Sequence, residues 1–133
     1  MENLNLNSGA IDLEKSESGV WIEYDSGISF LIARADTSPY RSAVRKMHKR
    51  YKRQIEQETL SDEKSDRLMA ELMAEHILLG WSGMMNGKEE FKYSRDNAVA
   101  FLSDERYAEV RQWIMAQSQD LENFRAEEVK KPK

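Results

Sequence analysis

Two short apolar runs lie close together in the first third of the chain, a pattern that is typical of paired strands. Residues 20–24 and 28–32 are rich in β-branched and aromatic side chains, and a glycine-containing turn separates them at 25–27. Two such runs around a short turn predict a β-hairpin over residues 20–35. The second run is apolar on both faces, so we expect one face to pack on helices.

The spacing of apolar residues becomes helical after residue 37. Apolar side chains recur three or four positions apart in four stretches, each with a serine at or beside its start that can cap the first turn. The predicted helices span 40–55, 61 or 62 to Gly80, 94–102, and 103 or 104 to 121. Residues 81–93 are left as a loop with room for a short β element, because Asn86-Gly87 is a strong turn dipeptide.

These elements predict an α+β fold that is mainly α-helical, with an N-terminal β-hairpin packed on a bundle of about four helices. We expect a single domain over residues 19–125. Residues 1–18 are polar and predicted to be a flexible N-terminal segment, and residues 126–133 a charged C-terminal tail.

Composition narrows the class of protein. The chain has 133 residues, of which 33% are charged, and no cysteine, which excludes disulfide scaffolds, zinc fingers and thiol nucleophiles. It begins without the pattern of a signal peptide and contains no apolar run of the roughly 20 residues that span a bilayer. We therefore expect a soluble protein of the cytoplasm with no membrane partner.

Residues suited to catalysis are sparse. His48 and His76 are the two histidines, and neither has a second histidine at ligand spacing. Ser82 lies in Gly80-Trp81-Ser82-Gly83, which lacks the second glycine of a nucleophile elbow. Glycine-rich phosphate loops are also missing. We expect no catalytic residue, no cofactor and no metal, and hence no enzyme.

Charge is unevenly distributed. Residues 37–55 carry a net charge of +7 without a single acid, whereas residues 56–80 sum to −5. A basic helix over 40–55 could bind nucleic acid as a small regulator. It could also be a solvated surface that the following acidic stretch neutralises, and this second interpretation is favoured.

Methionine and aromatic residues offer another kind of site. Met69 and Met73 fall on a helical stripe and are predicted to fill the core. Residues outside the clear stripes are candidates for binding a protein partner, because methionine and aromatic side chains suit interface cores: Trp81, Met84, Met85, Phe91 and Tyr93. For Trp81, packing beneath the hairpin is the favoured alternative.

The order of short motifs resembles the tail assembly chaperones of long-tailed phages and prophages. In that family a helix ending in Gly-Trp, a loop, a Tyr-Ser-x-x-Asn-Ala segment and a terminal Asn-Phe follow one another. The resemblance extends over residues 19–125, and the matching residues here are Gly80-Trp81, Tyr93-Ser94, Asn97-Ala98 and Asn123-Phe124.

The resemblance implies a function. Such chaperones bind the tape measure protein, keep its long apolar helices soluble, help recruit the tail tube protein and are absent from the finished virion. It therefore implies a protein-binding module of the host cytoplasm. Binding many copies along one client would also favour self-association into oligomers.

Overall fold

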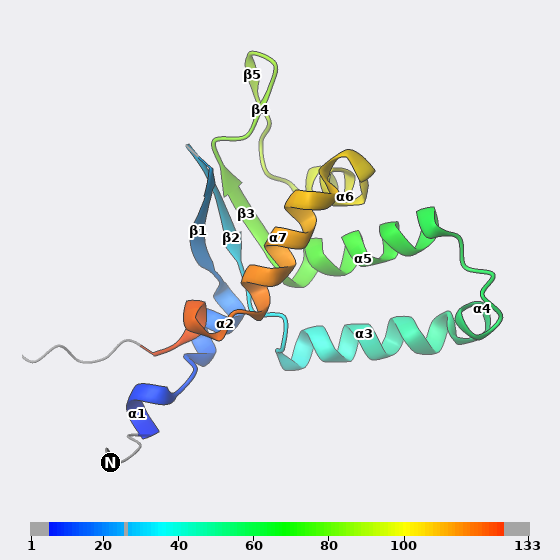
Figure 1. The fold of residues 1–133 in the computed structure, drawn as a ribbon, viewed down its shortest axis with the longest axis horizontal. Coiled ribbons are helices and arrows are strands. Elements are labelled where there is room, and N and C mark those ends of the chain that lie inside the picture. The colour runs from blue at the N-terminus through cyan, green and yellow to red at the C-terminus, as the bar shows by residue number, and fades with distance from the viewer. Residues whose placement is uncertain (1–5, 26, 127–133) are drawn as a thin grey trace, which may run out of the picture.

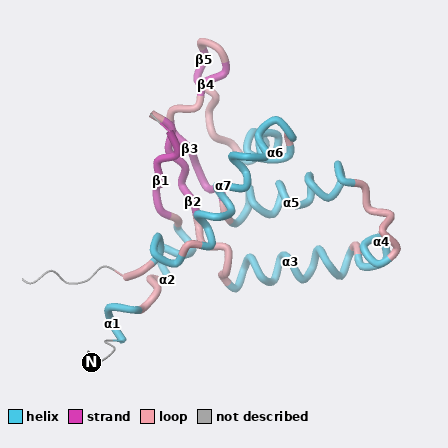
Figure 2. The backbone as a smooth tube through the Cα atoms, viewed as in Figure 1, coloured by secondary structure: helices cyan, strands magenta, loops and turns pink. Residues whose placement is uncertain are grey.

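The computed structural model describes residues 6–25 and 27–126 (Figures 1 and 2). A small antiparallel sheet packs on several helices, which confirms the predicted α+β class. Residues 1–5 of the predicted flexible segment and 127–133 of the predicted tail lie outside the described residues. The predicted domain boundaries stay predictions.

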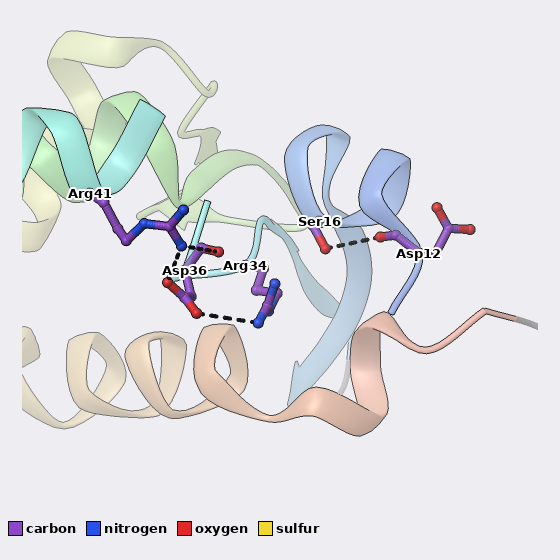
Figure 3. A network of polar contacts seen from close by, with 5 residues as sticks. All are labelled: Asp12, Ser16, Arg34, Asp36 and Arg41. Carbon is purple, nitrogen blue, oxygen red and sulfur yellow. Dashed lines mark hydrogen bonds and ion pairs between the residues drawn. The ribbon is translucent and has the colours of Figure 1, made fainter. Parts of the chain in front are cut away.

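The polar N-terminal segment contains two short helices, α1 (Leu6–Gly9) and α2 (Leu13–Ser18). The side chain of Asp12 caps α2, and its backbone N–H donates to the carbonyl of Phe124 at 2.7 Å. The buried hydroxyl of Ser16 donates to the carbonyl of Asp12 at 2.9 Å (Figure 3). Hydrogen bonds thus tie the start of the described chain to its end.

The sheet has three antiparallel strands in the order β1 (Val20–Asp25), β2 (Ile28–Ile32) and β3 (Leu78–Ser82). The first two strands form the predicted hairpin. Trp81 pairs with Phe30 in the centre of the sheet, and both side chains are buried. The sheet therefore joins two segments that are almost 50 residues apart in the sequence.

The third strand corrects the sequence analysis, which extended a helix to Gly80. Helix α5 (Asp62–His76) ends earlier, because Ile77 leaves the helical conformation at φ −120° and ψ −58°. The short apolar run from Leu78 to Trp81 fits a helix face as well as a buried strand. Hydrogen bonding to β2 decides between them, and local pattern does not contain that information.

Helices α3 (Ser38–Arg50), α4 (Lys52–Glu56) and α5 form an arm that extends away from the sheet (Figure 1). The single helix predicted over 40–55 is broken at Tyr51, whose φ of −107° is not helical. Thr37, rather than Ser38, caps α3 by accepting a hydrogen bond from the backbone of Tyr40. No residue of α3 is fully buried.

A short second hairpin follows β3. Strands β4 (Met85–Asn86) and β5 (Glu89–Glu90) pair around Asn86-Gly87, so the β element for which the sequence left room is present. This hairpin stands at the end of the molecule opposite α1 (Figure 1).

The last elements are α6 (Arg95–Ser103), the 3-10 turn η1 (Glu105–Tyr107), α7 (Ala108–Gln119) and the 3-10 turn η2 (Leu121–Phe124). Ser94 caps α6 as predicted, accepting from the backbone of Asn97 at 3.0 Å. The predicted last helix is therefore divided into η1, α7 and η2.

The core lies between the inner face of the sheet and helices α5, α6 and α7. Met73 is fully buried, as predicted, but Met69 is 38% exposed, so its prediction as a core residue is wrong. Trp113 of α7 covers the sheet, with its ring 4.8 Å from that of Tyr24. The buried cluster consists of Phe30, Ile32, Ala70, Met73, Ala74, Ile77, Leu78, Trp81, Ala98, Phe101, Leu102 and Ile114.

Candidate functional site

Trp81 organises the region between the sheet and the β4–β5 hairpin. It is 8% exposed and therefore a core residue, so the predicted burial is confirmed, but it lies in β3 beside the β1–β2 hairpin rather than beneath it. Its ring stacks on Phe91 at 5.3 Å and meets Tyr93 and Phe101 edge-on at 5.1 and 5.7 Å. Edge-on and offset contacts are the favoured geometries of aromatic pairs, so the cluster forms a rigid base for the β4–β5 hairpin.

Two side-chain hydrogen bonds fix this cluster. The indole Nε1 of Trp81 donates to the carbonyl of Phe91 at 2.7 Å, and the hydroxyl of Tyr93 donates to the carbonyl of Leu78 at 2.8 Å. Burial raises the pKa of the Tyr93 phenol, while the positive charge of Arg95 lowers it by less. The neutral phenol that donates this bond is therefore the favoured form.

An open pocket of about 310 Å³ lies between the β4–β5 hairpin and α6. Methionine and aromatic side chains supply most of its apolar wall, and Met85 at its edge is 59% exposed. The backbone of Phe91 donates to the carbonyl of Met84 at 2.8 Å, which anchors the base of the hairpin. We call this the Met–aromatic pocket; it is lined by Met84, Met85, Asn86, Phe91, Ala100, Phe101, Asp104, Arg106 and Tyr107.

One rim of the pocket is charged. The guanidinium of Arg106 donates to both carboxylate oxygens of Asp104, from Nη2 to Oδ2 at 2.7 Å and from Nε to Oδ1 at 3.1 Å. It also lies 5.4 Å from the ring centre of Tyr107, within the range of a cation–π contact. The hydrogen bonds from Arg106 hold the pKa of Asp104 below its usual value. The charges of Arg106 and Asp104 are thus paired with each other, and the apolar wall is the part of the pocket most suited to binding a partner.

The five residues predicted to bind a partner lie in one region but differ in accessibility. Met84, Met85 and Phe91 line the pocket, with Met85 exposed and the other two half-buried. Tyr93 is half-buried beside Trp81, and Trp81 is buried beneath them. Partner binding by these residues stays a prediction.

Sequence analysis missed the opposite wall of the pocket, which α6 and η1 provide. Phe101 packs against the core, and Tyr107 is 37% exposed with its ring 5.0 Å from that of Phe101. Tyr107 falls on the apolar stripe of the predicted last helix and Phe101 lies within the helix predicted over 94–102, so neither stood out as a candidate for binding a partner. The available sequence signal was the position of Tyr107 at the start of that stripe, three residues after Asp104.

Other candidate chemistry is dispersed. His48 is exposed, and His76 is half-buried with its ring centre 6.2 Å from that of Tyr40. Residues 6–25 and 27–126 contain no group of three or more His, Cys, Asp or Glu side chains placed to hold a metal ion. Within the same residues, no helix has the length and apolar character needed to cross a bilayer.

Comparison with known proteins identifies the family. The model of the YdaY prophage protein family matches residues 35–132, which is well over half of the chain. The chain belongs to the YdaY prophage protein family. The matched part of this YdaY-family protein begins just after β2 and includes the arm, β3 and all residues of the Met–aromatic pocket.

No curated protein and no solved structure matches the chain. The YdaY family match supports the phage or prophage origin that the resemblance to tail assembly chaperones implied. The β1–β2 hairpin lies outside the matched residues.

Proposed function

We propose that this prophage protein is a tail assembly chaperone of the host cytoplasm. It binds the tape measure protein, keeps it soluble and promotes assembly of the tail tube, and it is absent from the finished virion. It makes and breaks no covalent bond. In this role several copies coat one long client and contact one another.

The observation that carries the proposal is the Met–aromatic pocket. Met85 is exposed and Met84 half-buried on one wall, and Tyr107 faces them from the other. Methionine side chains are flexible and adapt to varied apolar partners. An open pocket with such walls suits an apolar side chain on one face of a client helix, as in helix-in-groove recognition.

Co-expression with the tape measure protein tests the proposal. The wild-type chain should raise the soluble fraction of the client. Met85→Lys places a charge on the exposed wall of the pocket and should reduce that gain about tenfold, because burying an unpaired ammonium group is costly. Met69→Lys is the matched control, because Met69 is also partly exposed but lies on α5, outside the pocket lining.

Three results would contradict the proposal. The client could stay insoluble with the wild-type chain, both variants could act like the wild type, or both could fail equally. Circular dichroism spectra of the purified variants, checked against the wild type, establish that each is folded. The position of the gene, between a tail tube gene and a long tape measure gene, is an independent expectation.

A further inference from the structure

Helix α3 carries a straight row of cations on its surface. Arg41, Arg45 and Lys49 are exposed and follow one another at intervals of four residues, so they rise about 6 Å apart along the helix. Met47, on a different side of α3, lines a groove with Leu68 of α5. We call Arg41, Arg45 and Lys49 the basic face.

The acidic residues of the neighbouring helix do not neutralise this row. Arg41 pairs with Asp36 just before α3, with 2.6 Å between NH1 and Oδ1 (Figure 3). Arg45 and Lys49 form no ion pair within the described part of the chain. The ion pairs that α5 forms go to other cations: Arg67–Glu71, Arg95–Glu75 and Arg111–Asp66.

This finding changes the interpretation favoured in the sequence analysis. Helix α3 is solvated, and no ion pair joins it to α5 within the described residues, although Lys52 of α4 pairs with Glu56 at 3.9 Å. Its charge is available to an external partner that carries the opposite sign.

The outer face of the sheet has complementary properties. Trp21 on β1 is 58% exposed, and its Cη2 atom lies 3.6 Å from where a Cβ of Gly80 would be. Glu23, two residues further on the same face, is exposed and has no ion pair among the residues described. Leu31 pairs with Trp21 across the hairpin. We call Trp21, Glu23 and Leu31 the acidic sheet face, in which Glu23 carries the charge.

We propose that the basic face of one copy docks on the acidic sheet face of a second copy. Glu23 attracts Arg45 and Lys49, and the exposed indole of Trp21 accepts a guanidinium over its ring. The aliphatic stems of these cations cover the apolar surface of Trp21 and Leu31.

This contact joins two different surfaces, so it does not close on itself. The arm and strand β1 lie on different sides of the molecule (Figure 1), so a docked pair of copies still has one free basic face and one free acidic sheet face. Repetition of such a contact builds an open chain rather than a closed dimer. The inference stands on these two faces and does not depend on the proposed client.

Sedimentation velocity of the purified chain tests the contact without any client. At about 50 mM salt the average mass should rise with protein concentration beyond that of a dimer. At about 500 mM salt, where the screening length falls to a few ångströms, the apparent dissociation constant should weaken by at least about tenfold. A wild-type protein that stays monomeric at low salt and high concentration would overturn the inference.

Charge reversal makes the test specific. The arm variant, Arg45→Glu with Lys49→Glu, and the sheet variant, Glu23→Lys with Ser29→Lys, should each fail to associate, because Ser29 pairs with Glu23 on the same sheet face. An equimolar mixture should associate again, since the reversed arm now fits the reversed sheet. The control Lys88→Glu with Lys92→Glu has the charge change of the arm variant at exposed residues elsewhere and should associate like the wild type.

Failure of the mixture to associate would overturn the inference, as would association of either variant alone. A separate experiment measures DNA binding by fluorescence anisotropy with a labelled 30-nucleotide DNA. Binding of DNA by a monomeric wild type, lost in the arm variant, would assign the basic face to nucleic acid instead. A fault in the chaperone proposal would leave all these measurements unchanged, because no client is present.

Discussion

At the scale of single residues, Tyr93 contributes both a hydrogen bond and an aromatic contact. Its hydroxyl donates to the carbonyl of Leu78 on β3, and its ring rests on the edge of Trp81. The residue therefore links the loop after the β4–β5 hairpin to the sheet. Losing this bond should loosen the base of the Met–aromatic pocket without opening the core.

Tyr93→Phe should lower the free energy of unfolding by about 1 kcal/mol, because the carbonyl of Leu78 loses a partner in a partly buried place. Urea unfolding measures the loss. Tyr107→Phe is the matched control: its hydroxyl forms no hydrogen bond within residues 6–25 and 27–126, so its effect should be within about 0.5 kcal/mol. Equal effects of the two variants would contradict a structural role for the Tyr93 hydroxyl.

The same tyrosine predicts a pH dependence. Burial raises the pKa of Tyr93 above its ordinary value of 10.0, so the folded state favours the neutral phenol. The contribution of the neutral Tyr93 phenol to the free energy of unfolding is fully present below pH 10 and is lost as the pH rises through the raised pKa. Urea unfolding between pH 8 and 11 should therefore show a steeper alkaline loss for the wild type than for Tyr93→Phe. Parallel profiles would contradict this assignment.

At the scale of elements, the junction after β3 sets the position of the second hairpin. Gly83 has a φ of +83°, and a Cβ there would overlap the carbonyl oxygen of Gly27 in the β1–β2 turn. The two hairpins thus approach each other at a place that only glycine fits. The Met–aromatic pocket depends on this junction, since Met84 and Met85 follow directly.

Gly83→Ala should lower the free energy of unfolding by at least about 2 kcal/mol, combining backbone strain with the steric overlap. Gly87→Ala is the control, because Gly87 also has a positive φ, +65°, but nothing lies within 4 Å of an added Cβ. Gly87→Ala should lower the free energy of unfolding by about 1 kcal/mol. Thermal unfolding measures both, and equal losses would mean that the overlap with Gly27 relaxes at no cost.

At the scale of the whole molecule, stability is unevenly distributed within the arm. Helix α5 buries Leu68, Ala70, Leu72, Met73 and Ala74, whereas α3 buries no residue fully. Elements with few buried contacts open locally at low free-energy cost. The basic face therefore lies on the part of the fold that gains most from being held by a partner.

Hydrogen exchange should show this difference. In about 500 mM salt, where the proposed contact between copies is screened, backbone amides of α3 should exchange at least about tenfold faster than those in the centre of α5. Exchange followed by mass spectrometry at peptide resolution is sufficient. Equal protection of the two helices would contradict the view that α5 is anchored in the core whereas α3 is held mainly by its packing on α5.

Local features of the fold could be predicted from the sequence because neighbouring residues decide them. The β1–β2 hairpin follows from two β-rich runs around a turn, the Asn86-Gly87 turn from its dipeptide, and the start of α6 from the side chain of Ser94. The uneven charge was equally visible, since a run of cations without an acid needs no structure to be recognised.

Only the tertiary structure decided the features that need distant partners. Leu78–Ser82 is a strand because β2 supplies its hydrogen bonds, and the pocket has a second wall because α6 and η1 lie beside the hairpin. Whether Arg45 and Lys49 are neutralised also depended on where the carboxylates of α5 find their partners. Periodicity reports which side of an element is apolar, but it does not report what that side meets.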